Sequence, residues 1–525
     1  NVIMNFANSQ NKRSFFSAYD QGGQANEGTQ NFSQDNFTPA LFGEFSVLRR
    51  LGPKKGSVSL RLNGTYNDFS SNWNNLSVIN EYQNGSSSQQ SINQLAEQEN
   101  TTRGYTINGN YSRPLSAKWS SSLAYTYNQS TNAAEQYTLD FNPVSGRYEI
   151  VVPSLSNRFD SENWYHTGSL GFIYTRKAWN MNFGTALQRS GLEGLSLNSS
   201  GAASGKIGEE YLNLLPRFAW NYRPKNNRTV QLNYRSMVNL PPVSQMQPVQ
   251  NNTNPLYQRE GNPDLDPRIN HRVTVNYNTF NTANDRYWNG YFAYNYAFNA
   301  ITSDTRFDKG VQVVKPVNVD GNYYIATGTN FGVPAKAPGL RFNFGMNFFY
   351  DHSKNFINSE ENLTNRLELG PNMSINYDYK EKLNISLSEF SGYNLVKNSK
   401  LVATDNKYWN FNTALTMSYE FVKDLRFEAD LNHTGYAGRA DEFNTNAFLL
   451  NAGIEKFLMK RQLGIAFRGF DILKQNVNID RIVNNTRIED VRYNNISRYF
   501  YLSLTYRLAK VGATNQRDNP RSIVN

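Results

Sequence analysis

The segment RYFYLSLTYRL (498–508) contains the pattern that decides the fold. Every second residue from Phe500 onward is aromatic or aliphatic, and the residues between them are mostly polar. The apolar side comprises Phe500, Leu502, Leu504, Tyr506 and Leu508. This alternation is typical of a β-strand with one apolar and one polar face. Its eleven residues also fit a tilted membrane-spanning strand, which needs about 9–11.

The same alternation recurs along the chain in pairs of segments joined by short turns. These turns include LGPKKG (51–56), SRPLSAK (112–118), FNTAND (280–285) and KEK (380–382). Three longer segments rich in Asn, Ser and Gln, 67–101, 129–164 and 236–267, are predicted to be loops rather than elements. Short turns on the periplasmic side and long loops outside are typical of outer-membrane barrels.

The pattern therefore predicts an all-β fold, a transmembrane outer-membrane β-barrel of about 20–22 antiparallel strands. The whole chain, 1–525, is expected to form one barrel domain, because no linker or composition shift divides it. This fold places the chain in the outer membrane of a Gram-negative bacterium, in contact with lipid. Over five residues a soluble sandwich strand would look similar, so the prediction rests on the length and repetition of the pattern.

The composition agrees with a barrel. Only 38% of the residues are hydrophobic, below the usual ~45–50%, although the chain has 33 Tyr, 33 Phe and 7 Trp. A barrel explains the low value, because half of each strand faces water in the lumen. No run of about 18 apolar residues exists, which excludes a membrane-spanning helix. The net charge is +10, but the basic residues are scattered, so no nucleic-acid partner is expected.

No catalytic or metal-binding motif is present, and neither an enzymatic activity nor a cofactor is predicted. The four histidines, His166, His271, His352 and His433, lack the spacing of metal ligands. Phosphate loops, G-x-S-x-G and HExxH sequences do not occur.

The aromatic residues fall into two groups. Those at predicted strand ends are expected to form girdles at the membrane interfaces: Tyr66, Trp119, Trp179, Trp220, Trp288, Trp409 and Tyr506. Those in the predicted loops are candidates for binding a ligand by stacking or burial, with loop packing as the alternative. They are Trp73, Tyr82, Tyr137, Trp164 and Tyr257.

The stretch NLPPVSQMQPVQNNTNPLYQREGNPDLDPRINHRVTVNY (239–277) resembles a signature of TonB-dependent receptor barrels, especially the outer-membrane β-barrel family of Bacteroidetes. The matching positions are Pro241, Pro242, Gly261, Asn262, Pro263, Leu265 and Pro267. Asp266 and Arg268 depart from the Lys and Glu usual in that family. The prolines indicate that the signature is structural and fixes a rigid turn before the next strand. The closing segment 498–508 resembles the family's C-terminal strand, which the barrel-assembly machinery recognises.

The resemblance implies an importer of bulky nutrients that carries a plug inside its barrel and receives energy from the TonB system. No plug sequence is recognisable in this chain, so a plug and about two strands are expected upstream or on another chain. Two alternatives remain open. One is a passive plugless porin, and the other is a structural barrel that scaffolds surface lipoproteins or a secretion assembly.

Overall fold

The computed structural model describes the chain with gaps. The described residues are 2–18, 25–52, 54–83, 86–225, 227–246, 251–254, 257–308, 311–380, 382–400, 406–438, 446–475, 479–483, 488–492 and 498–507. Leu508, the last position of the predicted closing strand, lies outside them.

A long antiparallel series of strands forms the wall of the molecule, and each strand pairs with the next one of the series. Among the described residues this series has twenty strands: β1 (Val2–Ala18), β2 (Ala25–Gly52), β3 (Gly56–Gln83), β4 (Ser86–Pro114), β5 (Trp119–Asn142), β7 (Asn157–Arg176), β8 (Trp179–Asn198), β9 (Ala203–Lys225), β10 (Arg228–Asn239), β13 (Arg268–Asn281), β14 (Arg286–Phe298), β17 (Asn322–Pro334), β18 (Leu340–Ile357), β19 (Glu360–Tyr379), β20 (Leu383–Asn398), β21 (Asn406–Val422), β22 (Leu425–Ala437), β23 (Asn446–Leu458), β24 (Leu463–Phe470) and β27 (Tyr499–Tyr506). The predicted all-β barrel fold is confirmed.

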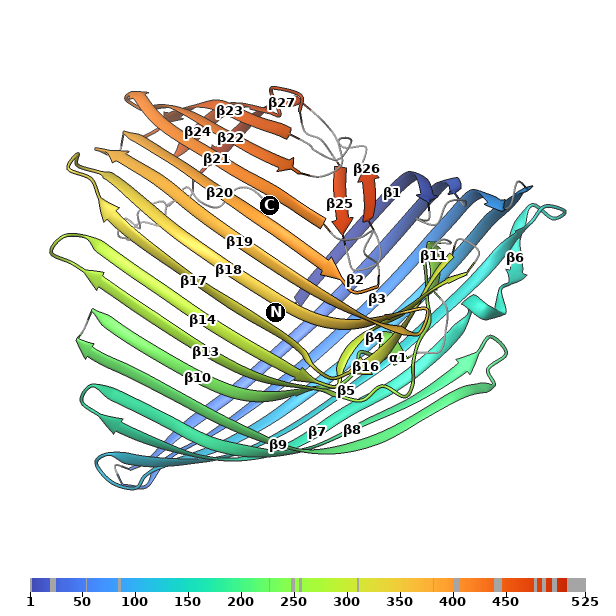
Figure 1. The fold of residues 1–525 in the computed structure, drawn as a ribbon, viewed down its shortest axis with the longest axis horizontal. Coiled ribbons are helices and arrows are strands. Elements are labelled where there is room, and N and C mark those ends of the chain that lie inside the picture. Colours follow the sequence, from blue (N-terminus) through green and yellow to red (C-terminus); the bar gives the residue numbers. More distant parts are fainter. Residues whose placement is uncertain are drawn as a thin grey trace.

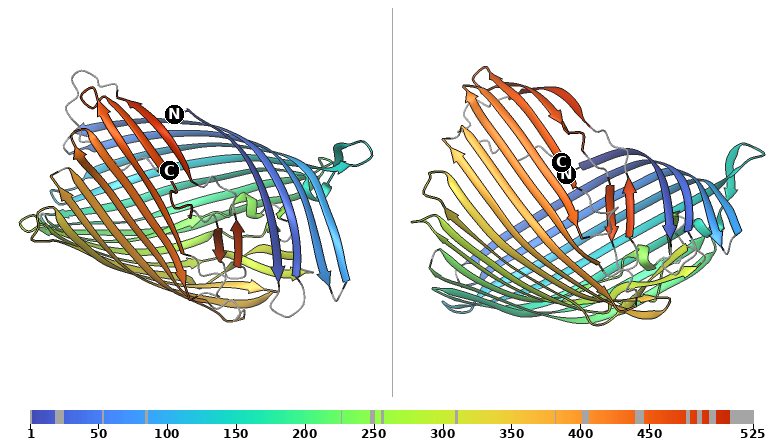
Figure 2. Two further views of the ribbon diagram at one scale, coloured as in Figure 1. Left: turned by 90° about the horizontal axis from the view of Figure 1, so that it is seen from above. Right: turned by 45° about the horizontal axis from the view of Figure 1, so that its top comes forward.

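The wall curves round, so that the first strands lie across from the yellow and orange strands of the second half (Figures 1 and 2). In the part of the chain that the structure describes, β1 pairs with β2 alone and β27 pairs with β24 alone.

Several short elements lie between the wall strands. They are β6 (Arg147–Val151), a 3-10 turn (Pro153–Leu155), α1 (Val243–Met246), β11 (Asn251–Asn254), β12 (Tyr257–Arg259), β15 (Ala300–Asp308), β16 (Val311–Val319), β25 (Ile479–Val483) and β26 (Ile488–Arg492). Hairpin β15–β16 makes two parallel contacts: β16 pairs with β12, and the middle of β15 pairs with the end of β18. None of the helices among the described residues has the length and apolar character needed to cross a membrane.

Two of the three predicted loops are wrong. Segment 67–101 forms the halves of β3 and β4 that lie nearest the turn joining them. The two strands pair without interruption from the pair Ser57 and Ser112 to the pair Gln83 and Ser86. Segment 129–164 likewise belongs largely to β5 and β7. Their Asn- and Ser-rich composition hides the strands, because both faces are polar where a hairpin projects beyond an apolar band. The third segment, 236–267, is largely a connection as predicted, although it begins with the end of β10 and contains α1 and the two short strands β11 and β12.

The short turns at the opposite end are as predicted, and two of them require glycine. Gly56 and Gly339 both have φ near +81°. A Cβ atom at Gly56 would lie 1.9 Å from the carbonyl oxygen of Ser112, and one at Gly339 would lie 1.8 Å from that of Asp378. No other residue fits these positions without moving the neighbouring strand.

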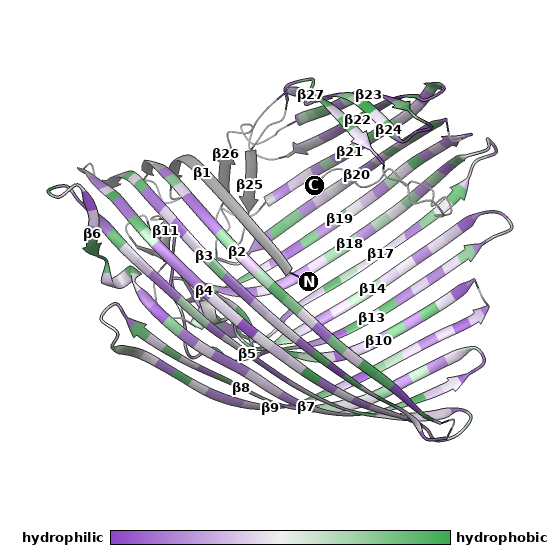
Figure 3. Cartoon of the chain, turned by 180° about the vertical axis from the view of Figure 1, so that it is seen from behind, coloured by the Kyte–Doolittle hydropathy of each residue, from purple (hydrophilic) through white to green (hydrophobic). Residues whose placement is uncertain are grey.

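The register carries one apolar face continuously around the wall. Directly paired residues share a face, and the pairs Leu502–Phe467, Phe467–Ile454, Ile454–Phe427, Phe427–Tyr419 and Tyr419–Leu383 follow one another from β27 to β20. Hydrophobic and hydrophilic residues alternate along the strands (Figure 3). We call the face that bears Leu502 the outward face and the opposite face the inward face.

Candidate functional site

The aromatic residues predicted for the girdles all lie on the outward face. Pairing places Trp119 opposite Tyr174, Trp288 opposite Phe331, and Trp409 opposite Tyr393. Their rings contact outward-facing neighbours: the ring centroids of Trp119 and Tyr174 are 4.8 Å apart, and those of Trp409 and Tyr393 are 5.1 Å apart. Rings with one apolar side and one polar edge suit the boundary between lipid and water.

The inward face carries an ion-pair network across β22, β23 and β24. Arg426 Nη2 lies 2.6 Å from Glu455 Oε2, and Arg468 Nη2 lies 3.3 Å from Glu428 Oε2. Arg468 also donates a hydrogen bond to Ser503 Oγ on β27, at 3.2 Å. Glu455 is only 8% exposed. Charge-assisted hydrogen bonds contribute about 1.5–3 kcal/mol each, so this network ties the last strands together on the luminal side.

The signature segment folds into the mouth of the barrel rather than away from it. Leu265 and Met246 are buried in one hydrophobic cluster with Phe159, Leu192 and Ile207, contributed by β7, β8 and β9. Asn262 of the signature holds the segment by two hydrogen bonds. Its backbone N–H donates to Gln245 O at 2.7 Å, and its side-chain amide donates to Pro316 O at 2.9 Å.

The rest of the signature is consistent with a structural role. Asn318 on β16 accepts a hydrogen bond from the backbone N–H of Asp266 at 2.8 Å and donates one to its carbonyl at 3.0 Å. Pro241 and Pro267 are buried, whereas Pro242 is exposed and Gly261 and Pro263 are half-buried. These contacts join the segment to hairpin β15–β16.

The structure does not bring the five candidate ligand-binding aromatics together. Trp73 is 4% exposed and packs against Phe32, with ring centroids 5.8 Å apart. Trp164 lies on the outward face, and the guanidinium carbon of Arg189 lies 5.7 Å from the centroid of the Trp164 ring. Tyr137 is exposed on the same face. The side chains of Tyr82 and Tyr257 lie outside the described part of the structure.

The four histidines also lie apart, and all four face outward. His166 contacts Tyr127, His271 contacts Phe298, His352 contacts Tyr323, and His433 contacts Phe448. Within the described ranges, no three His, Asp or Glu side chains are grouped to hold a metal ion. The histidines therefore belong with the aromatic residues of the wall.

Sequence analysis missed one row of polar side chains on the outward face. Glu389, Thr413 and His433 are directly paired across β20, β21 and β22. The signal was present, because Leu383, Ile385 and Leu387 precede Glu389 at intervals of two residues. A carboxylate on the apolar face can be recognised once the register is known.

Comparison with known proteins gives the family. The model of the "Outer membrane protein beta-barrel family" matches residues 53–356 and 351–506. A search of curated proteins found no match.

The solved structures that match this chain have low sequence identity to it. The siderophore receptor PirA from Pseudomonas aeruginosa is 12% identical, with a TM-score of 0.40, covering 86% of this chain and 79% of that one. The FrpB iron transporter from Neisseria meningitidis is 10% identical, with a TM-score of 0.39, covering 96% and 80%. The ferripyoverdine receptor of Pseudomonas aeruginosa is 11% identical, with a TM-score of 0.45, covering 90% and 67%.

The family match spans most of the chain and agrees with the twenty-strand wall and its outward apolar face. The outward face is therefore the lipid-facing one, and the protein lies in the outer membrane of a Gram-negative bacterium. The chain belongs to the outer membrane protein beta-barrel family.

Proposed function

We propose that this barrel is the membrane part of a TonB-dependent importer for a bulky nutrient. The observation that carries the proposal is the size of the wall. Its twenty described strands exceed the 16–18 of open porins and approach the ~22 of barrels whose lumen is plugged. An open lumen of that width would leak solutes, so an importer of this size needs a plug in its lumen.

The inward face supports the same proposal. A polar, charged lumen wall offers hydrogen-bonding partners to a folded plug, and the Arg426–Glu455 and Arg468–Glu428 pairs lie on it. The signature segment packs against inward-facing residues of β7, β8 and β9 at one end of that lumen. TonB would act on the plug rather than on the wall, so this chain supplies the channel and the outer surface.

The outer surface would provide the first contact with the nutrient. The projecting hairpins of β3–β4 and β8–β9 and the turn near Val144 are candidates, as are Tyr137 and Trp164 where β5 and β7 project beyond the apolar band. Aromatic rings at such positions suit stacking on sugars or burial against a peptide.

Electrical recording on the full-length protein tests whether the lumen is closed. In planar bilayers we expect no steady conductance at rest, with a general porin recorded in parallel as the open control. Steady ohmic conductance from the full-length protein would instead support a passive pore and contradict the importer.

A further inference from the structure

Glu389 lies on the lipid-facing side of the wall. It follows Leu383 by six positions on β20, an even number with no register shift, so the two side chains share a face. Leu383 pairs with Tyr419, and Tyr419 pairs with Phe427, which lies on the outward face. Its outward neighbours on the same strand are Leu387 below and Ser391 above. An ionisable group is unusual here, since the face below it is aliphatic, with Ile385 and Leu387 on β20 and Leu415 on β21.

The carboxylate is placed near the middle of the membrane band. A strand tilted by about 45° climbs roughly 2.3 Å per residue, so six residues raise Glu389 about 14 Å above the start of β20. The apolar band of such barrels is about 25 Å tall. A charge facing lipid at that depth destabilises the barrel, by less for Glu than for the ~2–4 kcal/mol of Arg or Lys.

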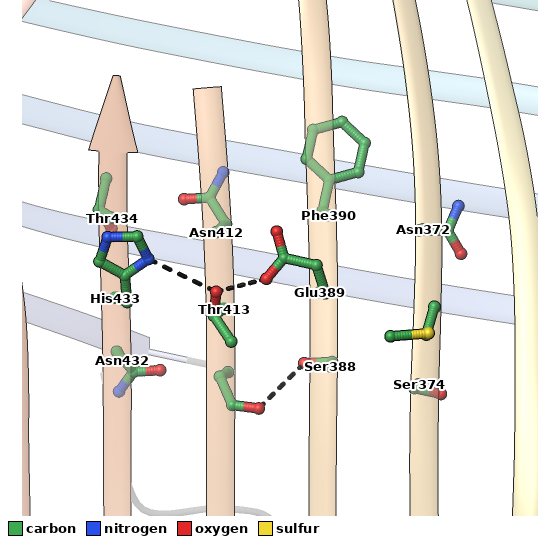
Figure 4. A pocket seen from close by; sticks show the side chains of 12 residues that line it. Asn372, Ser374, Ser388, Glu389, Phe390, Asn412, Thr413, Asn432, His433 and Thr434 are labelled. Atoms are coloured by element: carbon green, nitrogen blue, oxygen red, sulfur yellow. Dashed lines mark hydrogen bonds between the residues drawn. The ribbon is translucent and has the colours of Figure 1, made fainter. Parts of the chain in front are cut away.

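The hydrogen-bond partners of Glu389 are hydroxyl groups. Thr413 donates to one carboxylate oxygen, and Ser391 donates to the other at 3.1 Å. His433 Nδ1 lies 3.5 Å from the Thr413 hydroxyl, which completes a row across three strands (Figure 4). Among the described residues, Glu389 forms no ion pair.

Other lipid-facing charges are arranged differently. Arg189 forms an ion pair with Glu210 at 2.6 Å, and Arg103 lies over the ring of Tyr66 at 5.9 Å. These side chains lie ten or more residues from their periplasmic turns, near the outer boundary, where water reaches them. Glu389 is deeper, and no salt bridge from a described Lys or Arg reaches it.

The wall is hollowed at the same row. A cavity of about 460 Å³ is lined by Met373, Glu389, Thr413 and His433 together with the residues directly before and after each of them. The row thus combines a carboxyl group, a hydroxyl and an imidazole with a cavity beside them.

We propose that the row Glu389–Thr413–His433 is a docking site for a second membrane protein that presents a lysine or arginine from a membrane-embedded segment. Charge complementarity selects this partner: a cation at mid-depth gives the carboxylate the ion pair that it lacks, and contact excludes lipid from both groups. A buried pair of this kind fixes the orientation and register of two proteins in the membrane. The inference is independent of whether the barrel imports a nutrient.

Photo-cross-linking of the full-length protein in native outer membranes tests the site. A benzophenone side chain replaces Leu415, which faces outward beside Thr413 on β21, or Leu170, which faces outward on β7 across the barrel. We expect one defined cross-linked product from position 415 and none from position 170. Mass spectrometry should place the cross-link in a partner's membrane-embedded segment that carries Lys or Arg.

Charge variants decide whether Glu389 is responsible. E389Q should reduce the product at least tenfold, whereas the matched control E210Q should leave it unchanged. Heat-modifiable gel mobility verifies that both variants fold. An equal yield with E389Q, products at both positions, or a partner that proves to be a second copy of this chain would overturn the proposal. Absence of any product at position 415, together with greater heat resistance of E389L, would also overturn it. That result would mean that Glu389 only destabilises the barrel and binds no partner.

Discussion

Ser503 and Leu504 are neighbours in the sequence but face opposite environments. Ser503 accepts a hydrogen bond from Arg468 in the lumen, and Leu504 is 70% exposed on the lipid-facing side. This single-residue alternation was predictable from RYFYLSLTYRL alone. The period-two spacing of Leu383, Ile385 and Leu387 before Glu389 indicates that Glu389 lies on the apolar face of its own strand. Only the register of six successive strands shows that this face is the one that bears Leu504.

Arginine at position 504 should therefore harm the barrel more than arginine at position 503. A lipid-facing charge costs about 2–4 kcal/mol at the midplane and less toward the interfaces, and position 504 lies two residues from the periplasmic end of its strand, whereas the lumen is wet. Folding yield and urea stability of L504R and S503R measure the difference, and T505R supplies a second luminal control, since Arg468 already lies beside Ser503. Equal stability of L504R and the luminal variants would mean that the register is wrong.

At the scale of elements, the short turns and most wall strands were predictable, but the projecting hairpins were not. Strands β3 and β4 extend to Gln83 and Ser86 through residues that are weak strand formers, held by an unbroken ladder and by burial of Trp73. Trp73 and Trp164 were predicted to bind a ligand because they were expected to lie in loops. The structure places them in strands instead, Trp73 on the inward face and Trp164 on the outward face. Period-two patterns disappear where both faces carry mostly polar residues, and here even buried positions such as Ser71, Asn75 and Ser77 are polar.

Single cysteines can establish which end of the barrel faces outside, because the chain has no native cysteine. Val144 is 94% exposed in the turn between β5 and β6, and Leu115 is 54% exposed in the turn between β4 and β5. On intact cells an impermeant maleimide should label V144C and spare L115C, and permeabilised cells should label both. Labelling of L115C alone on intact cells would reverse the assigned orientation.

The signature segment should loosen when its hydrophobic anchor is removed. Leu265 is 1% exposed, and truncating such a leucine costs about 2–5 kcal/mol. L265A should make the bond after Arg259 more sensitive to trypsin while the barrel keeps its gel mobility, since long backbone ladders hold β7, β8 and β9 together. The exposed neighbour variant D264A serves as the control. Unchanged cleavage of L265A would show that the cluster does not hold the segment.

At the scale of the whole molecule, the fold and its membrane location follow from repetition of one local pattern. The substrate does not, because ligand recognition depends on how hairpins distant in sequence, such as β3–β4 and β8–β9, come together at the mouth. The alternating pattern of the wall strands likewise gives no information about a plug. Only the width implied by twenty described strands connects this architecture to energised import.

The most direct test of the importer is uptake by cells that express the full-length protein with and without a functional TonB system. Labelled ferric chelate, oligosaccharide and peptide serve as probes, and cells lacking the protein provide the background. We predict that at least one probe enters only when both the protein and TonB are present. Entry that persists unchanged without TonB would contradict the account.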